Sequence, residues 1–135
     1  MNIWIGVGRL TKDADLRYSQ NGTPIATFTI AIDREYQKDK ENKKTDFIYC
    51  KAFGARAEKY IGPYFHKGDL VEVRGEYNID NYEKEGEKRQ FHSINVQHAK
   101  VLHSKNYNQD RTVDTQEPYM DDLYPLDGDE SELHF

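Results

Sequence analysis

The sequence predicts a mainly β chain: a small five-stranded barrel with one short helix between its third and fourth strands, followed by a disordered acidic tail. Three observations lead to this prediction. Apolar and polar residues alternate with a period of two in five separate segments, which is typical of half-buried strands. One segment of helical composition interrupts the series, and the composition changes abruptly near residue 105. Five short strands with one helix suit a partly open barrel.

The first two expected strands cover residues 2–10 and 25–34. In the first strand Ile3, Ile5 and Val7 fall on one face, and two glycines on the other face indicate a bend or a close approach of backbones. An Asn-Gly turn signal followed by a proline precedes the second strand. The second strand alternates cleanly, so its larger apolar side chains should face the core.

The third expected strand, residues 46–53, follows a charged connection that contains four lysines. Its inward face is Ile48, Cys50 and Ala52. Its outward face is Phe47, Tyr49, Lys51 and Phe53. Residues on one side of a strand are about 7 Å apart, which resembles the spacing of splayed nucleotides. Stacking on such rings contributes about 1–3 kcal/mol per base with little sequence preference.

The remaining segments complete the barrel. Residues 55–61 read as a short helix that a Gly-Pro pair ends, and residues 70–77 read as the fourth strand. Residues 80–89 read as a long exposed hairpin tip around Gly86. Residues 91–102 supply the closing strand.

Charge divides the chain into two expected domains. Residues 1–105 carry 18 Lys and Arg against 15 Asp and Glu, a formal charge of +3, whereas residues 106–135 carry one arginine against nine acids, a charge of −8. The second segment lacks any period of 2 or 3.6 and too little of it is apolar to offset the cost of ordering, so disorder is expected. A solubilising tail is one interpretation. Leu133 and Phe135 at the terminus favour another, a docking tip.

No constellation in the sequence predicts catalysis. Two carboxylate pairs and two histidines come closest: Asp13 with Asp15, Asp121 with Asp122, and His92 with His98. The carboxylate pairs lack the further ligands of a nuclease metal site, and no third ligand is spaced for zinc. Glycine motifs that cradle phosphates are absent. We therefore expect no enzyme, no metal and no cofactor.

The cysteine count and the hydropathy pattern bear on the compartment. The single cysteine, Cys50, excludes an intramolecular disulfide, and no segment has the length of a membrane span or the layout of a signal peptide. We expect a soluble protein of a reducing compartment, the cytoplasm.

Cations lie beside rings in two expected loops. Arg34 lies close to Tyr36, and the expected hairpin tip holds Tyr82, Lys84, Lys88 and Arg89. This interleaving is typical of a groove that tracks phosphates while the rings hold bases. An alternative stays open, in which an oligomer interface or the helix buries Phe47 and Phe53.

A series of motifs resembles the bacterial and phage single-stranded DNA-binding protein family. The motifs are Val7-Gly-Arg-Leu-Thr-Lys-Asp, Leu16-Arg-Tyr, Asn21-Gly, Ala26-Thr-Phe-Thr-Ile-Ala-Ile, Phe53-Gly-Ala, Tyr60-Ile, Lys67-Gly-Asp-Leu-Val and Val73-Arg-Gly-Glu-Tyr. They fall in that family's order and spacing. The resemblance covers roughly residues 2–102 and returns at the last positions.

The resemblance implies a five-stranded OB-fold Greek-key barrel, assembled as a homotetramer, that coats single-stranded DNA during replication, recombination and repair. It places stacking aromatics at Tyr36, Phe47, Phe53 and Tyr82, several of which are tryptophan in well-known members. It also places subunit pairing in the first strand, which makes Ile3, Trp4 and Ile5 the expected oligomer interface.

The expected sites are therefore three. The single-stranded DNA site comprises Arg34, Tyr36, Phe47, Tyr49, Lys51, Phe53, Arg56, Tyr82, Lys84, Lys88 and Arg89. The tail site for replication and repair proteins comprises Asp129, Glu130, Glu132, Leu133, His134 and Phe135, with histidine where the family usually has proline. The third is the first-strand interface.

A second hypothesis for the function is an interaction module of a replication assembly that binds DNA only weakly. The expected location is the bacterial cytoplasm or nucleoid, or a host's cytoplasm for a phage-encoded chain.

Overall fold

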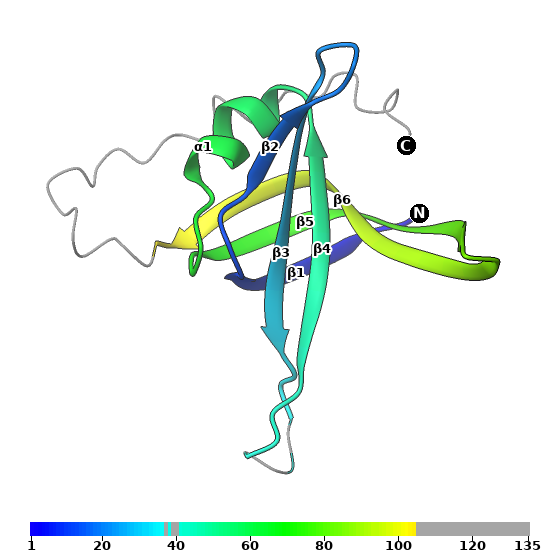
Figure 1. The fold of residues 1–135 in the computed structure, drawn as a ribbon. Coiled ribbons are helices and arrows are strands. Elements are labelled where there is room, and N and C mark those ends of the chain that lie inside the picture. The colour runs from blue at the N-terminus through cyan, green and yellow to red at the C-terminus, as the bar shows by residue number, and fades with distance from the viewer. Residues whose placement is uncertain (37, 39–40, 105–135) are drawn as a thin grey trace, which may run out of the picture.

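The computed structural model describes residues 1–36, 38 and 41–104, and within them the chain forms six strands and one short helical segment (Figure 1). The elements are β1 (Trp4–Leu10), β2 (Asp15–Tyr18), β3 (Pro24–Asp33), β4 (Thr45–Phe53), a π-helical turn η1 (Ala57–Ile61), one turn of α-helix α1 (Gly62–Tyr64), β5 (Leu70–Lys84) and β6 (Glu87–His103). The predicted tail lies outside the described residues.

The strands close into the predicted barrel. Their order is β1-β5-β6-β4-β3-β2, and β1 pairs with β3 as well as with β5, which closes five strands into a barrel with β2 added along β3. The β4–β6 pair is parallel and the other pairs are antiparallel. The five expected strands are β1, β3, β4, β5 and β6, with the helical segment between β4 and β5, so the predicted OB-fold is confirmed.

Two expectations about the strands were incomplete. The short strand β2 was not predicted, because four residues with one inward apolar side chain, Leu16, give almost no periodic signal. The expected tip at residues 80–89 is shorter than predicted. Strands β5 and β6 pair as far as Lys84 and Glu87, and the turn is Glu85-Gly86, both with positive φ. These polar residues are held in the strands by backbone hydrogen bonds, so the hydrophobic pattern of the sequence does not reveal that they belong to strands.

The core fills the barrel and is closed at one end by the helical segment. The inward residues of β3 and β4 face the core as their alternation predicts; Phe28 and Cys50 are fully buried, and Ile32 and Ile48 at the far end are partly buried. Phe65, which follows α1, packs edge-to-face against Phe28 and Tyr60 with ring centroids 5.2 and 5.3 Å apart. The Tyr60 hydroxyl accepts a hydrogen bond from the Val101 amide at 3.0 Å. Burial raises the pKa of the Cys50 thiol to about 12, so this thiol is protonated and unreactive at neutral pH.

Gly75 lies where β5 bends around the barrel, and it permits two backbones to approach closely. A Cβ at this position would lie 2.2 Å from the backbone oxygen of Asn95 on β6. We expect Gly75→Ala to lower the free energy of unfolding by about 3 kcal/mol or more, because backbone cannot move aside as a flexible side chain can. Guanidinium unfolding measures the loss. Gly22→Ala is the control: that site is open but has a φ of +84°, so about 1 kcal/mol is expected, and equal losses would contradict the close approach.

Candidate nucleic-acid interface

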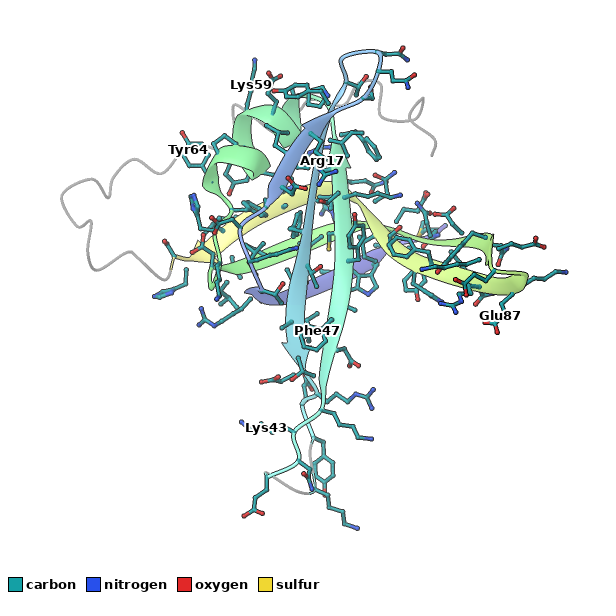
Figure 2. The ribbon with its side chains drawn as sticks, viewed as in Figure 1. Arg17, Lys43, Phe47, Lys59, Tyr64 and Glu87 are labelled. Atoms are coloured by element: carbon teal, nitrogen blue, oxygen red, sulfur yellow. The ribbon has the colours of Figure 1, made fainter. Side chains whose placement is uncertain are left out.

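The outer face of β4 carries the rings that the alternation predicts. Phe47 is 66% exposed and lies opposite Ala31 of β3, while Tyr49 is half-buried and lies opposite Thr29. The partners on β3 are small, so they do not cover the two rings. Figure 2 shows Phe47 near the start of β4, where β3 and β4 extend out of the barrel as one arm.

A ring outside the expected DNA site completes this face. Phe91 of β6 packs edge-to-face against Tyr49, with ring centroids 5.0 Å apart and planes at 69°. The sequence pattern indicates Phe91 only as the start of the closing strand. The period-two pattern against the buried Ile94 and Val96 shows that Phe91 points outward, but only the parallel β4–β6 pairing brings it to Tyr49.

The β5–β6 hairpin forms a second arm that leaves the barrel in a different direction (Figure 1). Tyr82 is 43% exposed, and it lines a shallow pocket of about 570 Å³ together with Asn81, Glu83 and Lys88. The expected cations of the hairpin lie opposite acids: Lys84 opposite Glu87 and Lys88 opposite Glu83. Arg89 forms an ion pair with Glu87 at 3.3 Å. Residues 80–89 hold four acids and three bases, so this arm offers rings rather than a positive field.

The β3–β4 loop carries the remaining expected contacts. Tyr36 is 83% exposed, and the lysines at positions 38 and 43 are also exposed. Arg34 donates two hydrogen bonds of 3.1 Å to the carboxylate of Asp46. This pairing raises the pKa of Arg34 and lowers the pKa of Asp46. Because the guanidinium is already held at the base of the loop, a phosphate there would compete with Asp46.

Two residues of the expected site are not on the surface. Phe53 was expected to face outward with Phe47, but it is only 2% exposed, and Arg56 is only 4% exposed. Phe53 lies opposite Ile25 at the end of β4, and the chain turns at Gly54 directly after it. Alternation assigns a side chain to a face of a strand but does not show which remote segment covers that face. Lys51, by contrast, is half-buried on the same face as Tyr49.

His98, on the outer side of β6, is surrounded mainly by cations. Burial and the charges of Arg74, Arg56 and Lys100 lower the pKa of His98, and Glu72 opposes them. The unfolded chain therefore binds a proton near pH 6.5 before the folded chain does, so stability should fall as the pH drops below that value.

We expect His98→Gln to flatten this fall. Melting temperatures of the wild type and the variant, measured from pH 8 to pH 5, should differ by a constant amount above pH 7 and converge below pH 6.5. Curves that stay parallel over the whole range would show that His98 contributes nothing to the acid sensitivity.

The first-strand interface residues divide between two faces. Ile3 and Ile5 are 60% and 61% exposed, whereas Trp4 points inward, is half-buried and packs against the core. A Cβ at Gly6 would lie within 3 Å of the Trp4 ring, so the ring lies over that glycine. The expected tail site, Asp129 to Phe135, lies outside the described residues.

Among residues 1–36, 38 and 41–104, no three His, Cys, Asp or Glu side chains form a group that could hold a metal ion. No helix in this part is long and apolar enough to cross a membrane.

A closed five-stranded barrel with exposed rings on one face and two projecting arms defines a ligand-binding OB-fold protein. The model of the single-strand binding protein family matches residues 1–102, and the chain belongs to this family. Members of the family are non-enzymatic DNA-binding proteins, which agrees with the prediction that the chain is not an enzyme.

Three bacterial relatives show the extent of the similarity. A single-stranded DNA-binding protein of Staphylococcus epidermidis is 37% identical over 116 residues, which are 86% of this chain and 87% of that protein. One of Fusobacterium nucleatum is 43% identical over 90 residues, 65% of this chain and 58% of the relative. Single-stranded DNA-binding protein A of Bacillus subtilis is 36% identical over 107 residues, 78% and 62% of the two chains. The chain thus spans little more than half the length of some relatives.

Proposed function

We propose that this chain binds single-stranded DNA without sequence preference, stacking bases on the exposed rings of its outer face. The observation that carries the proposal is the ring of Phe47, 66% exposed on a strand of a closed barrel. Exposure of an apolar ring of this size to water is unfavourable, whereas every base has a face that can stack on it. The names of the relatives support the same ligand.

Because the barrel domain carries only a modest positive charge, stacking on the rings must supply a large share of the affinity for DNA in this proposal. The formal charge of +3 on residues 1–105 is small, and acids lie opposite the bases of the hairpin. Few phosphates can then be neutralised, so the dependence of affinity on salt should be shallow for a DNA-binding protein. Lys38, Lys43 and Lys51 supply the phosphate contacts in this proposal.

Assembly and cellular role form the finer part of the proposal. Between Trp4 and Gly8, β1 pairs with β5 on one edge only, and the described residues place no strand on its other edge. With Ile3 and Ile5 exposed beside it, this edge suits pairing with a second copy in a homotetramer. The protein would coat DNA strands during replication, recombination and repair in the cytoplasm, and its acidic tip would recruit partner proteins.

Titration of the full chain with labelled oligo(dT) tests this function. We expect tight binding that weakens as salt rises from 50 to 300 mM, much weaker binding to duplex DNA, and a tetramer mass by light scattering. Micromolar binding that does not depend on oligonucleotide length would reject the proposal in favour of an interaction module.

Removal of residues 127–135 should leave binding unchanged or slightly tighter, since an acidic tail competes with DNA.

A further inference from the structure

Phe91 and Tyr49 form a ring pair where the two arms of the molecule diverge. The edge-to-face contact, with centroids 5.0 Å apart, restrains the Phe91 ring. Phe91 nevertheless remains 38% exposed. A restrained ring with open surface loses little conformational entropy when a flat ligand stacks on it. Tyr49 thus acts as a support that holds Phe91 in position.

The strand register places Phe91 between the two arms. On the hairpin Phe91 lies opposite Asp80, and Tyr82 lies opposite Arg89, so Phe91 and Tyr82 share one face as diagonal neighbours. Diagonal neighbours in a sheet are about 7–8 Å apart. Phe47, Tyr49, Phe91 and Tyr82 therefore form a continuous series of rings from β4 across β6 to β5, which we call the ring track.

Two polar atoms on the same face of β6 lie next to this pair. Ser93 is 2% exposed, and within the described part of the chain its Oγ has no hydrogen-bond partner. The side-chain oxygen of Asn95, the next residue on this face, is in the same condition. The pairing of Cys50 with Ile94 puts Ser93 beside Tyr49. Buried polar atoms normally have partners, so these two leave unused hydrogen-bonding capacity next to the ring pair.

We propose that Phe91 is a further base-stacking residue, and that the Tyr49–Phe91 pair leads the bound strand from β4 onto the hairpin. This inference rests on the proposed function and adds the path that the strand follows. The near-neutral hairpin cannot hold phosphates by charge alone, so rings must supply the affinity along this part of the path.

Phe91→Ala tests the proposal against a matched control on the same hairpin. Ile79 is 49% exposed but lies opposite His92, on the other face. We expect F91A to weaken binding of a long oligo(dT) about tenfold, the loss of one stacked base, and I79A to change it less than twofold. Phe91→Leu retains apolar bulk against Tyr49 without an aromatic face, and it should show the same loss with an unchanged melting temperature.

The outcomes separate this inference from the proposed function. A wild type that fails to bind oligo(dT) overturns the function itself. A wild type that binds, with F91A and F91L equal to it, overturns only the role of Phe91. Equal losses in F91A and I79A also overturn it, because the effect would then follow from the apolar surface of the hairpin and not from stacking.

A fluorescence pair provides a second readout that a purely structural role would not change. F91W and I79W each add one tryptophan to Trp4, on opposite faces of the hairpin. Saturating oligo(dT) should quench the emission of F91W well beyond that of the wild type, and should leave I79W close to the wild type. Quenching in F91W that does not exceed quenching in I79W would overturn the proposed path.

Discussion

Replacement of both Phe47 and Tyr36 by alanine is expected to weaken binding of oligo(dT) at least tenfold while the barrel stays folded. The two rings are 66% and 83% exposed, so neither contributes appreciably to the core. Each stacked base contributes about 1–3 kcal/mol, and loss of one such contact alone accounts for a tenfold change. Fluorescence anisotropy with labelled oligonucleotides measures the affinity, and circular dichroism confirms the fold.

The matched control is a pair of tyrosines beside the helical segment. Tyr18 and Tyr64 are 53% and 46% exposed, and Figure 2 shows Tyr64 at the helical end of the molecule, away from Phe47. Alanine at both positions should change affinity less than twofold. A larger loss from this pair than from Phe47 and Tyr36 would move the DNA path to the helical end and reject the interface proposed for β4.

Replacement of Phe65 by alanine is expected to have the largest effect on stability, about 3–5 kcal/mol in the free energy of unfolding. Phe65 is fully buried and makes edge-to-face contacts with two rings, Phe28 from the barrel and Tyr60 from η1. Its removal leaves a cavity where the helical segment closes the barrel. Denaturant unfolding at one fixed protein concentration measures the loss.

Phe65→Leu separates the cavity from the ring geometry. Leucine refills most of the volume, so less than half the loss of the alanine variant is expected. Both variants should bind oligo(dT) like the wild type wherever they are folded, because Phe65 is buried in the core whereas the ring track lies on the outer face of the sheet. An alanine variant within 1 kcal/mol of the wild type would show that the helical segment does not stabilise the barrel as described.

Much of the fold could be predicted because alternation of apolar residues reports directly on a strand with one buried face. The inward sets of β3 and β4 face the core as predicted, although Ile32 and Ile48 are only partly buried, and Phe47 and Tyr49 lie on the outer face. The strand β2 and the true length of the hairpin were not predictable in this way. In these segments backbone hydrogen bonds hold mostly polar residues in an extended conformation. Such residues show no alternation of apolar and polar side chains in the sequence.

The candidate site was predictable only in part. Residue type and spacing indicated Tyr36, Phe47, Tyr49 and Tyr82, all of which keep exposed surface. The same pattern wrongly placed Phe53 outside, because segments distant along the chain decide what covers the end of a strand. The ion pair between Arg34 and Asp46 could not be foreseen either, since it spans a loop whose path the sequence does not specify.

The sequence by itself determined the alternating strands, the turn at Gly86, the contrast in charge at residue 105 and the family to which the chain belongs. These features depend on residues close together in the sequence, or on motifs whose spacing along the chain can be read directly. Only the tertiary structure decided which rings meet. Tyr49 and Phe91 are 42 positions apart, and the parallel pairing of β4 with β6 brings them into contact. Such pairing depends on closure of the whole barrel, which no single segment encodes.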